Sequence, residues 1–117
     1  MRKRFNNSLT LVITYILTHL LALNGQWVGR LLSIVDRKTA EIHFHPHAEA
    51  NTKIRAIDVD KIVETVRSGK IIWHKCEYPD KIAFKRFFND GWTYTAITKI
   101  YPDSIQVKTI WKEKGKW

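Results

Sequence analysis

Histidine and arginine residues that could act on a phosphodiester lie in one stretch of this chain, between Glu41 and Gly69. His47 is followed eight residues later by Arg55. Cleavage of RNA without a metal needs a base for the 2′-hydroxyl proton, an acid for the leaving oxygen and a cation for the phosphate. Histidine suits the acid–base steps because it titrates near neutral pH, and arginine grips phosphate with two parallel hydrogen bonds. The pair is therefore one candidate for a ribonuclease centre.

Later segments supply further groups of the same kind. A basic strand could bring cations to the phosphate, and two hydroxyl groups could join them from neighbouring strands. The full predicted catalytic set is His47, Arg55, Lys85, Arg86, Tyr94 and Thr109. The alternative for the first pair is structural. Arg55 would then form a salt bridge between a helical segment and the sheet, and His47 would cap that segment.

Three histidines that alternate along the chain suggest a second kind of site. In a strand, His43, His45 and His47 would point to one side, and three imidazoles can hold zinc while leaving one position open. Pro46 interrupts that strand, however, and the sequence shows no definite fourth ligand. We therefore expect no metal and no other cofactor. The histidine triplet is kept as the alternative.

Aromatic residues are interleaved with basic ones in the second half of the chain. Rings that stack on bases, beside cations that hold phosphates, are typical of proteins that bind single-stranded RNA. Most of these rings must nevertheless form the core, because the sheet needs one buried face. Alternation places Lys85 and Arg86 on opposite faces of one strand, and the sequence does not decide which of them faces the helices.

A capped helix and a series of strands must position these groups. Asp58 is a good N-cap, and Ile57 and Ile62 have the spacing of a hydrophobic staple. Gly69 can supply the left-handed residue that ends the helix. Runs rich in β-branched and aromatic residues, separated by turns, predict strands at 42–45, 71–78, 82–88, 92–100 and 105–111. We predict an α+β domain with an antiparallel sheet of four to five strands and helices on one face.

The first 40 residues are predicted to form a helical extension ahead of this domain, which covers 41–117. A basic start at positions 2–4 precedes the apolar run Leu9–Leu23. The run is shorter than the ~20 residues that span a bilayer, and threonines recur in it every fourth residue. We expect it to pack as a helix on the domain, with a signal peptide or membrane anchor as the alternative. A second amphipathic helix is predicted from Trp27 to about Val35.

The composition is basic, with 20 lysines and arginines against 11 acidic residues and a formal charge of +9. Such an excess favours an acidic partner, either nucleic acid or an anionic membrane surface. Cys76 is the only cysteine. An internal disulfide and a cysteine-rich zinc module are therefore both excluded.

The central stretch also resembles a known family. His47-Ala48, then Arg55, Ile57 and a helix with an acidic cap, are similar to the His-Ala…Arg-Gly-Ile segment of a family of small uncharacterised prokaryotic domains related to the RelE and BrnT toxin folds. The run Gln106–Trp111 resembles the closing strand of that family. The chain departs from the pattern at Asn51, where the family often has arginine, and at Ala56, where it usually has glycine. The resemblance implies a RelE-like sheet and a toxin-like activity.

These observations lead to one function and two alternatives. We predict a metal-independent, toxin-like ribonuclease in the cytoplasm, with RNA as substrate and an antitoxin protein as a partner. The first alternative is a non-catalytic module of the same fold that binds nucleic acid or protein. The second is a membrane-associated or exported protein held by its N-terminal segment.

Overall fold

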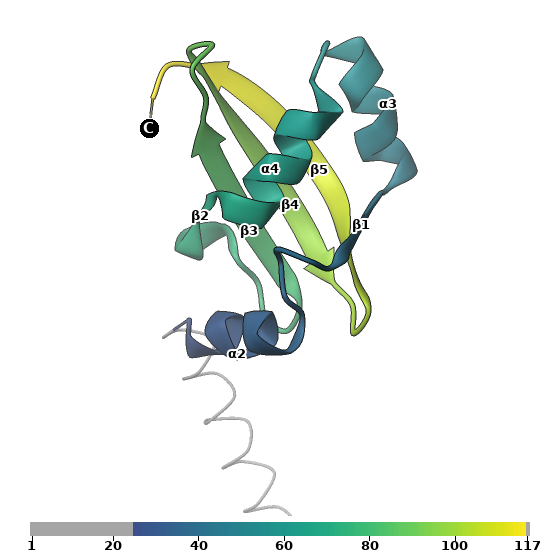
Figure 1. Cartoon of the computed structure of the whole chain (residues 1–117), viewed down its shortest axis with the longest axis vertical. Helices are drawn as coiled ribbons and strands as arrows, with labels where there is room; N and C mark the ends of the chain where they lie inside the picture. The colour runs from purple at the N-terminus through teal and green to yellow at the C-terminus, as the bar shows by residue number, and fades with distance from the viewer. Residues whose placement is uncertain (1–24, 117) are drawn as a thin grey trace, which may run out of the picture.

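The computed structural model describes residues 25–116 (Figure 1). The predicted helix at Leu9–Leu23 lies outside this part of the chain. Within it, the elements in order are α2 (Gln26–Ile34), β1 (Glu41–Phe44), α3 (Pro46–Ile54), α4 (Val59–Ser68), β2 (Lys70–Ile71), the 3-10 helix η1 (Trp73–Lys75), β3 (Lys81–Phe87), β4 (Trp92–Ile100) and β5 (Ser104–Lys114). None of the helices in residues 25–116 is long and apolar enough to cross a membrane.

The strands form one five-stranded sheet in the order β1-β5-β4-β3-β2. Strands β2 to β5 are antiparallel neighbours, whereas β1 runs parallel to β5. The predicted α+β class and number of strands are confirmed, but the expectation of a wholly antiparallel sheet is wrong. Short turns force antiparallel pairing, whereas the long connection through α3 and α4 allows β1 to join the far edge in the parallel sense.

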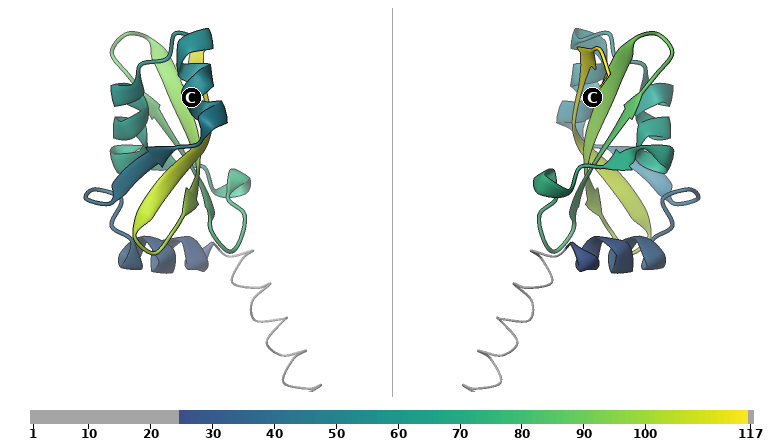
Figure 2. Two further views of the ribbon diagram at one scale, coloured as in Figure 1. Left: turned by 90° about the vertical axis from the view of Figure 1, so that its right-hand side faces the viewer. Right: turned by 90° about the vertical axis from the view of Figure 1, so that its left-hand side faces the viewer.

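The predicted strand at 71–78 is also wrong beyond Ile71. Ile72 still donates its N–H to the carbonyl of Ala83, at 2.9 Å. After it, the N–H of Lys75 bonds to the carbonyl of Ile72 and that of Cys76 to the carbonyl of Trp73. These local bonds make η1, which leaves the sheet edge and lies on the side of the sheet opposite α4 (Figure 2).

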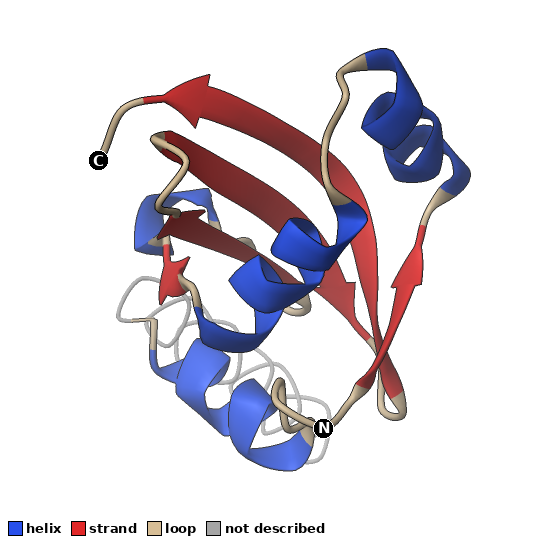
Figure 3. Ribbon diagram, turned by 45° about the horizontal axis from the view of Figure 1, so that its top comes forward, coloured by secondary structure: helices blue, strands red, loops and turns tan. Residues whose placement is uncertain are grey.

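Helix α4 packs on β3 and β4, α3 lies beside β5, and α2 crosses one end of the sheet (Figures 1 and 3). Alternate residues of the strands form the buried face beneath α4, including Ile82 and Phe84 of β3 and Ala96 of β4. Trp27 and Val28 of α2 belong to the same hydrophobic core. We call the opposite side of β3, β4 and β5 the open face. Among the described residues, η1 is the only helical element on it.

The ends of α4 are fixed largely as the sequence predicts. The Asp58 carboxylate accepts from the N–H of Asp60 at 2.9 Å, and Ile57 and Ile62 are both buried. The prediction of a left-handed Gly69 is wrong, because its φ is −71°. Glycine is needed there for space instead: a Cβ atom would lie 2.4 Å from the carbonyl oxygen of Thr65 and 2.7 Å from that of Lys85.

Arg37 joins the segment before β1 to the end of α4. Its guanidinium donates to the carbonyls of Val66 and Gly69, each at 2.7 Å, and lies 4.3 Å from the centre of the Phe84 ring. Partial burial lowers the pKa of Arg37. Arginine stays charged at neutral pH even so, and a cation at the C-terminus of a helix is favourable.

Helix α3 ends in a Schellman motif that requires a left-handed residue. The N–H of Ile57 bonds to the carbonyl of Thr52 at 2.9 Å, and that of Ala56 points to the carbonyl of Lys53 at 3.5 Å. Ala56 has a φ of +50°, which is unfavourable for a residue with a Cβ atom.

Ala56→Gly is therefore expected to stabilise the protein by on the order of 1 kcal/mol, raising its melting temperature by roughly 4–8 °C. Thermal unfolding measures this. The matched control is Ala50→Gly in the interior of the same helix, which should cost about 1 kcal/mol. If Ala56→Gly and Ala50→Gly lowered the melting temperature equally, the left-handed conformation assigned to Ala56 would be contradicted.

Candidate functional site

The first predicted pair does not come together. His47 lies in the first turn of α3, and Arg55 is the residue that caps its other end. The rise of an α-helix places residues eight apart about 12 Å apart along the axis. Both side chains are exposed. Helix α3 therefore separates the imidazole from the guanidinium that was expected to hold the same phosphate.

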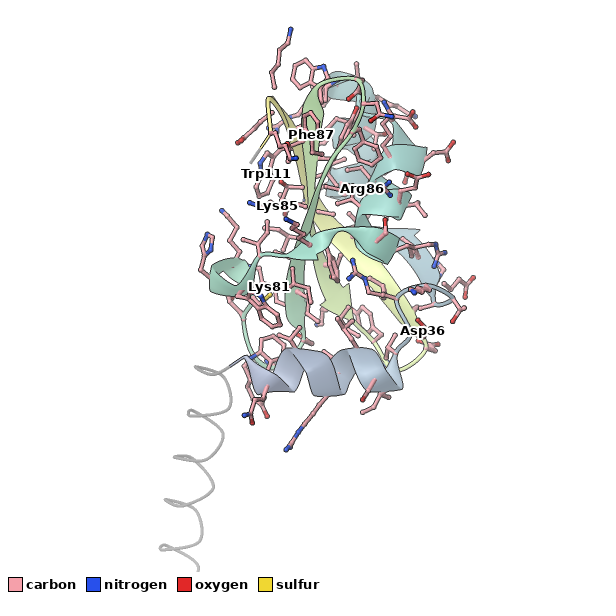
Figure 4. The ribbon with its side chains drawn as sticks, turned by 60° about the vertical axis from the view of Figure 1, so that its left-hand side comes forward. Asp36, Lys81, Lys85, Arg86, Phe87 and Trp111 are labelled. Carbon is pink, nitrogen blue, oxygen red and sulfur yellow. The ribbon has the colours of Figure 1, made fainter. Side chains whose placement is uncertain are left out.

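The remaining predicted residues are divided between the two faces of the sheet. Lys85 and Thr109 lie on the open face. Arg86 and Tyr94 lie on the helix-covered face (Figure 4). Arg86 donates to Ser68 Oγ at 2.6 Å and pairs with Glu64 at 3.2 Å, both on α4. Tyr94 is buried, and burial raises the pKa of its hydroxyl. The predicted catalytic set thus occupies three separate places.

Two of the three alternating histidines, His45 and His47, interact at the start of α3. His45 Nδ1 accepts from the N–H of His47 at 3.1 Å, and the two rings stack 5.1 Å apart. Partial burial lowers the pKa of His45, and the charges of Lys108 and His47 lower it further. A neutral imidazole is needed for this bond, because a protonated one has no acceptor. His43 points instead toward Glu41, at 3.6 Å. Residues 25–116 hold no group of three or more ligands placed to bind a metal.

The open face carries a different set of groups, arranged in rows across the strands. Lys85 of β3 is opposite Thr95 of β4, which is opposite Trp111 of β5. Neighbouring strands are about 4.8 Å apart, so the ammonium-bearing and indole-bearing positions are about 10 Å apart. Figure 4 shows Lys85 and Trp111 on the side of the sheet away from Arg86.

A hollow of about 280 Å³ lies over this row, with η1 forming one wall. It is lined by Ile72, His74, Lys75, Lys85, Thr95, Trp111 and Glu113. The Lys75 ammonium lies 5.3 Å from the Trp111 ring, at the distance of a cation–π contact. We call this the η1 hollow. It brings together one imidazole, one carboxylate, two ammonium groups and one indole.

Two further hollows continue along the same face. One, of about 300 Å³, shares Lys85 with the η1 hollow, adds Lys70, Phe87 and Lys116, and extends to Ser68 and Arg86 on the helix-covered side. The other, of about 350 Å³, is lined by Lys81, Lys99 and Lys108 among others. Carboxylates offset part of this charge. Glu77 lies 3.2 Å from Lys81, and Asp80 lies 3.9 Å from Lys99. In the η1 hollow, the Glu113 carboxylate lies among the same lining residues as Lys75 and Lys85.

Sequence reasoning placed Lys75 among the basic residues that could hold RNA, but it did not select His74 or Glu113 for this site. His74 and Lys75 fall in a stretch that reads as a strand, where alternation would send them to opposite faces. Glu113 lies beyond the end of the predicted last strand, but β5 continues to Lys114. In the structure Glu113 pairs with Thr93, two residues along β5 from the pair formed by Trp111 and Thr95. Extending the predicted strand in this register would have placed Glu113 on the same face as Trp111.

Comparisons with protein-family models, with curated proteins and with solved structures found no match to this chain.

Proposed function

We propose that this protein binds single-stranded RNA across the open face of its sheet. The observation that carries the proposal is the η1 hollow, where Trp111 is flanked by Lys75 and Lys85. An indole offers a stacking surface to any base, and ammonium groups beside it can neutralise the adjoining phosphates. This combination favours the non-catalytic, nucleic-acid-binding reading over a centre built on His47 and Arg55.

The arrangement suits an unpaired strand better than a duplex. A base can stack on Trp111 only when it is not already stacked inside a double helix. The part of β4 from Thr93 to Lys99 is on the order of 20 Å long. Hollows with basic linings follow one another over that length. Several nucleotides of an extended strand therefore have a continuous path with cations on both sides.

Trp111→Ala is expected to weaken RNA binding by about 1–3 kcal/mol, or roughly 5- to 150-fold, because one stacking surface is lost. A titration of the full chain with a short unstructured RNA, followed by fluorescence anisotropy, measures the change. Affinity should also fall as salt rises, because binding releases counterions from the phosphates.

The chain offers a matched control for this variant. Trp92 also sits beneath a lysine, with the Lys112 ammonium 4.8 Å from its ring, but it packs against the core on the helix-covered face. Trp92→Ala should leave RNA affinity close to that of the parent in variants that remain folded. If both variants bind as the parent does, or if the parent binds no RNA at low salt, the open face is not a nucleic-acid interface.

A second candidate function is RNA cleavage in the same hollow. It is favoured by one further observation, that His74 and Glu113 line the η1 hollow with the two lysines. In this candidate the Glu113 carboxylate removes the proton of a ribose 2′-hydroxyl, and the 2′-oxygen attacks the adjoining phosphorus. Protonated His74 gives its proton to the departing 5′-oxygen, while Lys75 and Lys85 stabilise the charge on the phosphate. The products are a 2′,3′-cyclic phosphate and a 5′-hydroxyl.

A further inference from the structure

We propose that Trp73 and Tyr78 contact the surface of an anionic lipid bilayer, at the end of the domain where α2 begins. We call these two residues the aromatic rim. Trp73 is 57% exposed and Tyr78 is 48% exposed, so both present large rings to the surroundings. Tryptophan and tyrosine favour the membrane–water interface because their rings are apolar while each carries one polar group.

The aromatic rim surrounds the point where the preceding sequence joins the domain. A Cβ atom on Gly25 would lie 3.1 Å from Cε3 of Trp73, so the indole packs directly on the Gly25 backbone. The Tyr78 ring meets Trp27 edge-on, with their centroids 5.7 Å apart. Both aromatic side chains are therefore held against the first turn of α2.

The sequence before Gly25 favours a bilayer as the partner, in line with the membrane-anchor alternative for Leu9–Leu23. Leu9–Leu23 contains no Asp, Glu, Lys or Arg, and Arg2, Lys3 and Arg4 precede it. A run of this length is shorter than the ~20 residues that span a bilayer, and stable attachment through a weak apolar signal requires a second one. Basic residues beside the apolar run favour anionic lipid. The aromatic rim supplies the second contact, on the domain itself.

This surface adjoins the one proposed for RNA, because Trp73 belongs to η1 and Tyr78 lines the hollow of about 350 Å³. In Figure 4, Trp111 and Lys85 lie along the sheet, well away from the end at which α2 crosses. The two proposals name different residues, so each has its own variants.

The test uses the full chain and two kinds of vesicle, phosphatidylcholine alone and phosphatidylcholine with phosphatidylglycerol. The parent is expected to float with the anionic vesicles. The double variant Trp73→Ala/Tyr78→Ala should need several-fold more lipid for half-maximal binding. The control Phe87→Ala/Trp111→Ala removes two rings from the open face and should bind vesicles as the parent does.

Quenching by brominated lipids measures directly whether Trp73 of the aromatic rim contacts the bilayer. The difference in emission between the parent and Trp73→Phe isolates Trp73, and this component should be quenched when anionic vesicles carry bromine near the headgroup. The conservative change also keeps the test decisive if the double alanine variant does not fold. The proposal is overturned if the parent binds no vesicles, if the double alanine variant folds and binds them as well as the parent, or if Trp73 is not quenched in the vesicle-bound protein.

Discussion

RNA cleavage by the His74→Ala variant is expected to be on the order of 10²–10⁴-fold slower than by the parent, with RNA binding retained. The variant lacks the acid that protonates the departing 5′-oxygen, whereas Trp111 and the lysines of the η1 hollow remain to bind RNA. Single-turnover cleavage of a labelled RNA measures the rate. The appearance of 2′,3′-cyclic phosphate ends identifies the reaction.

Three comparisons make the result interpretable. Glu113→Gln should also slow cleavage, because an amide cannot take the 2′-hydroxyl proton. An RNA that carries a 2′-deoxy sugar at the cleaved position should bind but not react. His47→Ala changes an exposed histidine outside the hollow and should cleave as the parent does.

Two outcomes would reject this centre. If the His47 variant loses cleavage and the His74 variant does not, the site predicted from the sequence is the correct one. If the parent binds RNA and never cleaves it, the protein is a binding module.

The Arg37→Met variant is expected to lose about 1.5–3 kcal/mol of stability and to melt on the order of 10 °C lower. Methionine keeps much of the packing over Phe84 but leaves the carbonyls of Val66 and Gly69 without their charged donor. These carbonyls are at the end of α4, where a helix has no internal donors to offer. Thermal and urea unfolding both measure the loss.

Arg37→Lys and Arg55→Met serve as controls for this variant. Lysine keeps the charge, but it cannot present a planar fork to two carbonyls, so most of the loss should remain. Arg55 is exposed, and its replacement should change stability by a few tenths of a kcal/mol at most. If Arg37→Met and Arg55→Met have the same melting temperature, the contacts of Arg37 contribute little to stability.

Several elements could be predicted from the sequence because their causes are local. The Asp58 cap and the Ile57–Ile62 staple act within a single turn, so the beginning of α4 is encoded by residues close to it. Short turns with proline, aspartate or glycine likewise connect β3, β4 and β5 in antiparallel order. Alternation also correctly separated Lys85 from Arg86.

The choice of face required the tertiary structure. Ile82 and Phe84 are buried against α4, so Arg86 lies on their side and reaches Glu64, while Lys85 is left on the open face. The same burial removes Tyr94 from any surface site. Periodicity defines two sets of residues, but the free energy of burying one set against a helix distant in sequence decides which is inside.

The candidate site depended even more on contacts between distant segments. His47 and Arg55 are close in sequence, yet the straight axis of α3 holds them at opposite ends. His74 and Glu113 are far apart in sequence, yet η1 and the register of β5 place both around one hollow. The sequence by itself determined the capped helix and the antiparallel strands β3 to β5, because both follow from residues that are neighbours in the chain. The tertiary structure alone decided which of those residues meet, because the parallel pairing of β1 and the strand register are set by burial across the whole sheet.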